Sequence, residues 1–211
     1  MRTASFIKLL VEDKRSPPSV RQDIKLASVL ATAVTAIVFS CVIGVRPDID
    51  AAVGSIRFLY KFVVTLAIAG TSGSLLYGIG QPGLPLRGKA WGLLVPVFLL
   101  AAAVVAELHA VAPTQWEVRM IGHNSRLCLT IIPSLSVVPL ACFLLALRGG
   151  APTSPTCAGG VAGLVSAGIA ATFYAANCND DSPLFVMLWY PIAIAIVAAS
   201  GALLGRYFLR W

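Results

Sequence analysis

Six long apolar runs, separated by short polar connections, limit what this chain can fold into more than any other feature. A run of about 20 mostly apolar residues is long enough to cross the hydrocarbon core of a bilayer. Five of the runs contain no charged residue, and the second contains only Lys61. The runs cover residues 26–45, 58–79, 90–106, 127–147, 157–176 and 184–205. The sequence therefore predicts an all-α membrane protein with six transmembrane helices.

The composition agrees with that class. Only 12% of the residues are charged and 58% are hydrophobic, whereas about 25% of the residues of a soluble domain are charged. The first apolar run begins only at residue 26, while a cleaved leader places its apolar core directly after a short basic start. We therefore expect the first run to be a transmembrane helix.

The lysines and arginines predict the orientation. Six spans place both termini on one side, and that side carries a balance of +8 against −1 on the other. Cytoplasmic connections are enriched in Lys and Arg, so both termini are predicted to be cytoplasmic, in a multi-pass protein of the cell inner membrane. Topology accounts for the net charge of +7, and we expect no direct contact with nucleic acid.

None of the connections is long enough for a soluble domain. We therefore divide the chain into a cytoplasmic N-terminal tail, residues 1–25, and a transmembrane domain, residues 26–211. In the tail, Phe6, Leu9 and Leu10 recur at helical spacing. Two interpretations stay open: a short amphipathic helix on anionic lipid, or a segment whose apolar side chains bind a partner protein.

Two of the five cysteines have a matching predicted depth. Cys128 lies at the outer end of the fourth span and Cys178 at the outer end of the fifth, whereas Cys41, Cys142 and Cys157 lie elsewhere. A disulfide requires a Cα separation below about 7 Å, which the sequence does not supply. The pair is interpreted either as small apolar core residues or as functional thiols.

Two acids follow Cys178 in the stretch "NCNDDSPLFVMLWY", residues 177–190. In the simpler interpretation, Ser182 caps the sixth helix, and Asp180 and Asp181 interact with the positive end of its dipole. The acids also stand next to a thiol, which makes them candidate sensing residues together with Cys178.

A second stretch on the same side, "MIGHNSRLCL", residues 120–129, brings His123 close in sequence to Cys128. A cysteine or histidine beside carboxylates can bind a soft divalent metal or change the pKa of a thiol. The spacing matches no closed zinc site. We therefore expect no resident metal or cofactor.

Sequence motifs for catalysis are absent. Glu107 stands at the outer boundary of the third span and is expected to reach the interface, and Lys61 is expected to extend outward in the same way. A membrane thiol oxidoreductase is the first alternative, but such enzymes usually have a Cys-x-x-Cys pair. A small transporter is the second, but it requires broken helices around a polar site at mid-depth. The sequence favours a protein that is not an enzyme.

Four motifs together resemble the NrsF-type family of negative regulators of sigma F, which are integral-membrane anti-sigma factors. The motifs are "GVRPD" (44–48), "IGHNSRLCL" (121–129), "LRGGAPTSP" (147–155) and "NCNDDSPLFVMLWY" (177–190). The resemblance implies that the cytoplasmic N-terminal region binds an extracytoplasmic-function sigma factor and keeps it from RNA polymerase. It also implies that Cys128 and Cys178 take part in sensing a stress such as a toxic metal or an oxidant.

Overall fold

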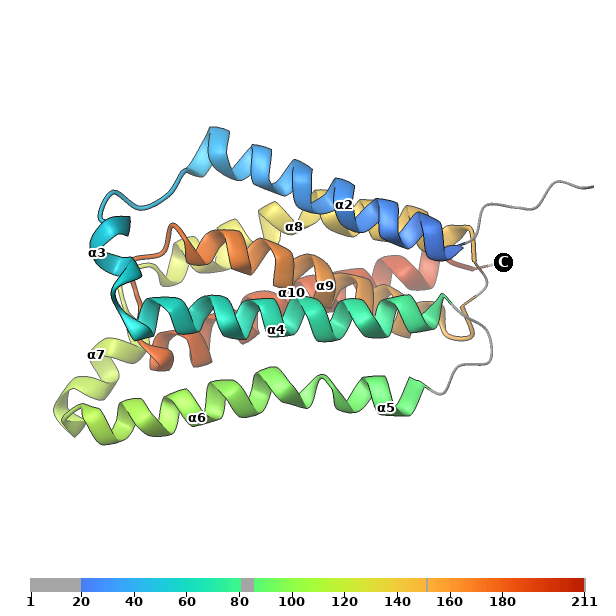
Figure 1. The fold of residues 1–211 in the computed structure, drawn as a ribbon. Coiled ribbons are helices and arrows are strands. Elements are labelled where there is room, and N and C mark those ends of the chain that lie inside the picture. Colours follow the sequence, from blue (N-terminus) through green and yellow to red (C-terminus); the bar gives the residue numbers. More distant parts are fainter. Residues whose placement is uncertain (1–19, 81–85, 151, 211) are drawn as a thin grey trace, which may run out of the picture.

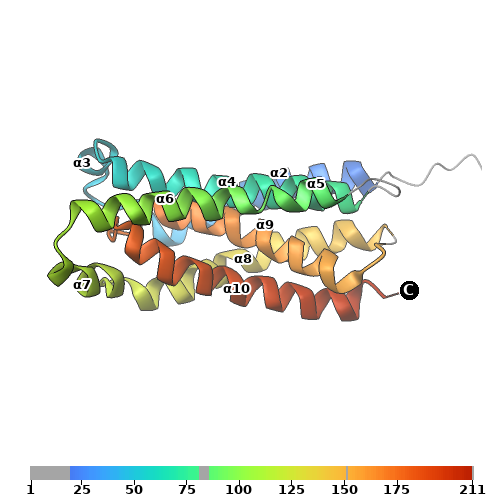
Figure 2. The same cartoon turned by 90° about the horizontal axis from the view of Figure 1, so that it is seen from below.

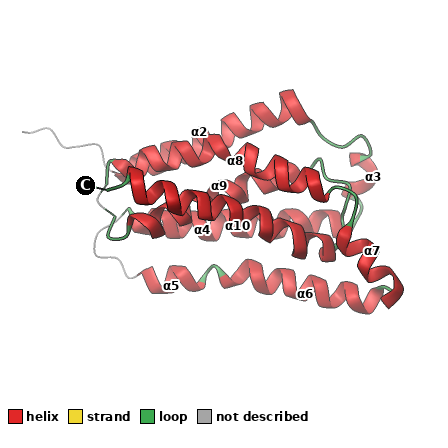
Figure 3. Ribbon diagram, turned by 180° about the vertical axis from the view of Figure 1, so that it is seen from behind, coloured by secondary structure: helices red, strands yellow, loops and turns green. Residues whose placement is uncertain are grey.

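The protein is a bundle of long helices. The computed structural model describes residues 20–80, 86–150 and 152–210, and within these ranges it contains helices and loops but no strand (Figure 3). Six helical segments are long and apolar enough to cross a membrane, as predicted. They are α2 with η1 (Val20–Ile43), α4 (Ile56–Ile79), α5 with α6 (Leu86–Ala110), α8 (Ser125–Arg148), α9 (Pro155–Ala175) and α10 (Pro183–Phe208).

The bundle has two different ends (Figure 1). One end carries the short helices α3 (Ile49–Val53) and α7 (Trp116–Ile121), the 3₁₀ turn η2 (Pro113–Gln115) and the connection from α9 to α10; we call it the α3 end. The start of α2 and the end of α10 lie together at the opposite end, the terminal end. This agrees with an even number of crossings, while the cytoplasmic placement of the terminal end stays a prediction.

The predicted tail overlaps the first helix. α2 (Val20–Val38) begins six residues before the apolar run, so its first turns belong to the segment that the sequence assigned to the tail. The three apolar tail residues at the candidate partner-binding positions lie outside the described residues: Phe6, Leu9 and Leu10.

Two spans are irregular for identifiable reasons. The first ends in a π-helical turn, η1 (Phe39–Ile43), and then at Gly44, whose φ of 74° favours glycine. The third span breaks between α5 (Leu86–Trp91) and α6 (Leu94–Ala110). Pro96 stands two residues into α6; it has no N–H to donate, and its ring crowds the carbonyl of Gly92 four residues earlier.

α9 lies inside the bundle and packs against α4, α8 and α10 (Figures 1 and 2). Its contact with α10 is a direct approach of the two backbones. A Cβ on Gly159 would stand 2.2 Å from the Gly201 carbonyl oxygen, and one on Gly163 would stand 2.6 Å from that of Val197. Only glycine permits this separation, and α9 and α10 therefore form a tightly packed pair.

Candidate functional site

The connection between α9 and α10, residues 176–182, is the centre of the polar structure at the α3 end. Ser182 ends it by capping α10: its hydroxyl oxygen accepts a hydrogen bond from the Leu184 N–H at 3.3 Å, and Pro183 takes the first helical position. This cap confirms the simpler interpretation of the Ser-Pro step. The two preceding acids, however, have partners on other segments.

Asp181 binds two cations that come from distant parts of the chain. Lys61 Nζ of α4 lies 2.6 Å from Asp181 Oδ1, and Arg46 Nη1 lies 2.9 Å from Oδ2. Lys61 also donates to the Cys178 carbonyl oxygen at 2.8 Å, and its side chain is only 1% exposed. The prediction that Lys61 extends outward was wrong, because a buried ammonium with a carboxylate and a carbonyl in reach gains more from them than from a distant interface.

Arg46 uses the other side of its guanidinium for Asp48. Its Nε and Nη2 donate to the two Asp48 oxygens at 2.7 and 2.6 Å, in the bidentate geometry that suits a carboxylate. The hydrogen bond to Asp48 raises the pKa of Arg46, and the same bond lowers the pKa of Asp48 to about 2. Arg46 Nη1 also reaches the Cys178 carbonyl oxygen at 3.3 Å. Arg46 thus joins the 44–48 connection to the Cys178 segment.

Asp180 fixes the start of α8. Its Oδ2 accepts hydrogen bonds from the backbone N–H groups of His123 and Asn124 at 2.9 and 2.7 Å. These donors stand at the N-terminus of α8, where the positive end of the dipole favours an anion. The His123 side chain is 92% exposed, and its Nδ1 lies 3.7 Å from Asp180 Oδ1. The structure therefore brings His123 to Asp180 mainly through its backbone.

Glu107 is buried and paired, contrary to the expectation that it reaches the interface. Its carboxylate is 4% exposed and accepts from Arg57 Nε at 2.8 Å and from Arg119 Nη1 at 3.1 Å. Ser182 also donates to it at 3.5 Å. A carboxylate at the end of a membrane helix needs such partners when it turns inward. Glu107 thereby joins α6 to α4, α7 and the start of α10.

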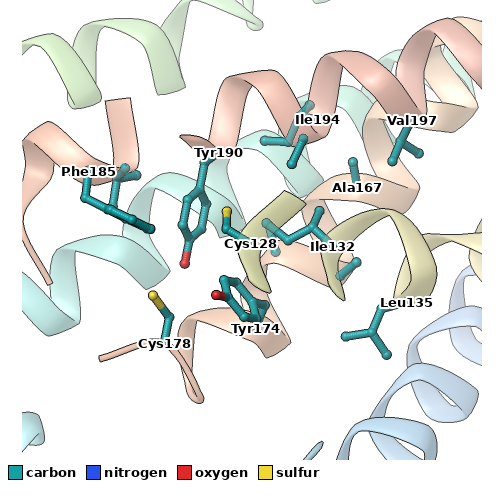
Figure 4. Packing of buried hydrophobic residues seen from close by; sticks show 14 of the residues in the cluster. Cys128, Ile132, Leu135, Ala167, Tyr174, Cys178, Phe185, Tyr190, Ile194 and Val197 are labelled. Atoms are coloured by element: carbon teal, nitrogen blue, oxygen red, sulfur yellow. The ribbon is translucent and has the colours of Figure 1, made fainter. Parts of the chain in front are cut away.

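Cys128 and Cys178 lie in one buried cluster with Tyr174 and Tyr190 (Figure 4). Their residues are 0% and 1% exposed, and both are free thiols. Burial raises the pKa of Cys178, and the nearby Lys61 opposes this only in part. Cys178 is thus a protected, un-ionised thiol rather than a reactive thiolate.

The two tyrosine hydroxyls near the thiols differ in their hydrogen bonding. The buried Tyr190 hydroxyl has no hydrogen-bond partner among the described residues, whereas the Tyr174 hydroxyl donates to the Asn124 carbonyl oxygen at 3.4 Å. A pocket of about 320 Å³ opens beside Asp180, Asp181 and His123. Small solutes at the α3 end therefore have access to the two acids but not to the sulfur atoms. The described residues contain no group of three metal-ligating side chains.

The sequence predicts that His123, Asp180 and Asp181 lie near the two cysteines, and the structure places all of them at the α3 end. The sequence did not predict that Arg46, Lys61 and Glu107 belong to the same polar region. One signal was available: a charged residue in or beside an apolar span is costly unless it is paired. That signal predicts a partner without identifying it.

Comparison with known proteins gives a consistent result. A family model described as "Negative regulator of sigma F" matches residues 10–211. The anti-sigma-F factor NrsF of Caulobacter vibrioides (strain NA1000 / CB15N) is 30% identical over 217 aligned positions, which cover 100% of both chains. The probable anti-sigma-F factor NrsF of Azospira oryzae is 28% identical over 213 positions, again with complete coverage of both. No solved structure matches.

Proposed function

The chain belongs to the family of negative regulators of sigma F, and from this we propose that it is an inner-membrane anti-sigma factor that binds an extracytoplasmic-function sigma factor at its cytoplasmic face. The observation that carries the proposal is the match over residues 10–211. Family membership favours a regulator over the thiol oxidoreductase and the transporter considered from the sequence. A sigma factor is the partner that an anti-sigma factor implies.

The terminal end is the proposed cytoplasmic face. Its described helix ends carry several arginines and lysines, in agreement with the enrichment of positive residues in cytoplasmic segments. The tail provides the proposed contact with the sigma factor, because its apolar residues Phe6, Leu9 and Leu10 have the spacing of a helix that binds in a groove. The connections between spans are too short to supply a comparable surface.

Sensing is proposed at the opposite end, by Cys128 and Cys178 with His123, Asp180 and Asp181 around them. What supports this is the shared buried cluster of the two thiols and the dense contacts of the Cys178 segment. A periplasmic oxidant or soft metal that reaches the thiols during local opening of the α3 end changes the packing of α8 against α9. Decisive switching between two states requires about 5 kcal/mol of differential stabilisation, and a disulfide supplies a substantial part of that amount.

The test measures repression and its relief in one reporter strain. We expect the intact protein to co-purify with a sigma factor and to repress a promoter that depends on it. Replacing Phe6, Leu9 and Leu10 with Ala should abolish both, whereas replacing Lys8, Glu12 and Lys14 with Ala should preserve them. The double variant Cys128→Ser/Cys178→Ser should lose the response to stress, and Cys41→Ser/Cys157→Ser is its control.

Two results would contradict the proposal separately. If the intact protein captures no sigma factor and represses no promoter, the anti-sigma role is wrong. If repression is intact but the double cysteine variant responds to stress like the wild type, the thiols have no part in sensing.

A further inference from the structure

The connection that carries Cys178 is fixed at two points by the same two cations. Lys61 and Arg46 both donate to the Cys178 carbonyl oxygen, at 2.8 and 3.3 Å, and both form ion pairs with Asp181. The two donors come from α4 and from the connection that follows the first span. We call Arg46, Lys61 and Asp181 the Asp181 cluster.

The two cations of the cluster are shielded from water. Lys61 is 1% exposed and the Arg46 side chain 7%. The two cations lie over the ring of the buried Phe58, with Nζ of Lys61 5.4 Å and Cζ of Arg46 5.7 Å from its centroid. A buried ion has no water to replace a lost partner, so separation of these groups is far more costly than it would be at a solvated surface.

The cluster joins α4 and the connection after the first span to the connection between α9 and α10. Residues 176–182 belong to the α9–α10 hairpin, whose helices are in backbone contact through glycines. A movement of the connection must therefore displace it from Arg46 and Lys61 or distort the hairpin. Because Arg46 N–H also donates to the Ala176 carbonyl oxygen at 3.1 Å, the contact with the first span extends along the segment.

We infer that Lys61 and Arg46 are positioning residues that, through Asp181, fix the Cys178 segment in the state that binds the sigma factor. This rests on the proposed function. Opening of the cluster is then a required step of the stress response, and a substitution that opens it produces release without any stress. Neither cation touches the stimulus or the sigma factor; each acts through the position of the connection.

The experiment compares Lys61→Met and Asp181→Asn with two matched controls at the same end. Arg126→Met and Asp50→Asn remove charges from exposed side chains without an ion pair among the described residues. In unstressed cells, we expect both cluster variants to raise sigma-dependent transcription toward the level of cells that lack the protein. The controls should repress like the wild type. Transcription in the double variant Lys61→Met/Asp181→Asn should be little higher than in Asp181→Asn, because the effects of replacing two partners in one interaction are not additive.

A second readout is independent of the sigma factor. In purified protein whose other four cysteines are replaced by Ser, alkylation of Cys178 by a maleimide should become on the order of tenfold faster in the cluster variants, since the thiol is then reached through local opening. A variant that only weakens the whole fold would also expose buried sites elsewhere. A protein with the half-buried Cys142 of α8 as its single cysteine serves as the reference for such a general loosening, and its alkylation rate should be the same with and without the cluster substitutions.

The outcomes separate the two proposals. If the wild type does not repress transcription, the anti-sigma role fails, and the alkylation rates still decide whether the cluster positions the loop. If the wild type represses while both cluster variants, at wild-type membrane levels, repress equally and keep Cys178 protected, the inference is overturned. Should Lys61→Met be missing from the membrane, Asp181→Asn, which preserves the side-chain shape, decides the result.

Discussion

The two ends of the bundle are stabilised by different interactions. At the α3 end, ion pairs of Asp181 and Glu107 and the backbone hydrogen bonds of Asp180 connect α4, α6, α7 and the connections around them. At the terminal end, α9 and α10 meet through glycine backbones at Gly159 and Gly205. The described cations there form no ion pair with a described residue: Arg21, Lys25, Arg87, Lys89, Arg148, Arg206 and Arg210.

This difference separates contacts that depend on the charge of a side chain from contacts that do not. An ion pair depends on the charge and position of both partners, so a change at a thiol or a carboxylate alters it. Backbone contact between two glycine surfaces has no titratable or oxidisable group. In the proposed function, the α3 end is therefore the responsive part, while the cations of the terminal end, which form no ion pair within the described part of the chain, are left for anionic lipid or a partner.

The largest effect is expected from adding one methyl group to the glycine contact. Gly159→Ala places a Cβ 2.2 Å from the Gly201 carbonyl oxygen and 2.8 Å from the Gly205 Cα, and the helices must separate. We expect a loss of about 3 kcal/mol in the free energy of unfolding, at the upper end for overpacked sites. Denaturant titration in detergent micelles measures it.

Gly73→Ala is the matched control, because its Cβ would meet nothing within 4 Å. An alanine there should stabilise α4 by about 0.5 to 1 kcal/mol through its better helix propensity. If the two variants unfold alike, the close contact between α9 and α10 does not stabilise the terminal end.

The sequence predicts the terminal end better than the α3 end. At the terminal end, the four-residue spacing of Gly159 and Gly163 indicates close helix packing from local sequence alone, and α9 and α10 meet there. At the α3 end, only the helix start at Ser182–Pro183 could be predicted in the same local way, and it is confirmed. The ion pairs join residues far apart in the chain, such as Arg57 with Glu107. Local sequence shows that a buried charge needs a partner, but the choice of partner follows from how the helices pack.

A smaller loss is expected from removing the acceptor at the start of α8. Asp180→Ala leaves the backbone N–H groups of His123 and Asn124 without their carboxylate at 2.9 and 2.7 Å. Loss of such a charge-assisted pair costs about 1 to 3 kcal/mol. Thermal unfolding in detergent tests it, with His123→Ala as control. That exposed side chain should change stability by less than about 0.5 kcal/mol, and an equal loss in both variants would contradict the assignment to Asp180.

The smallest effect concerns the outer member of the ion-pair network, Asp48. Its pKa falls from 3.8 to about 2 through the hydrogen bond from Arg46. A lowered pKa in the folded state means that the interaction stabilises the protein fully above pH 4 and that this contribution disappears as the pH falls through about 2. Because the Asp48 side chain is 55% exposed, solvent screens most of the interaction.

Asp48→Asn should therefore unfold at a slightly lower temperature than the wild type at pH 5, and the difference should shrink as the pH is lowered from 4 to 2. Asp50→Asn, at an exposed acid on the neighbouring short helix α3, should follow the wild type throughout. If the unfolding temperatures of Asp48→Asn and the wild type still differ at pH 2, Asp48 acts through its shape and not its charge. The ion pairs of the α3 end would then stop at Arg46 and Asp181, inside the bundle.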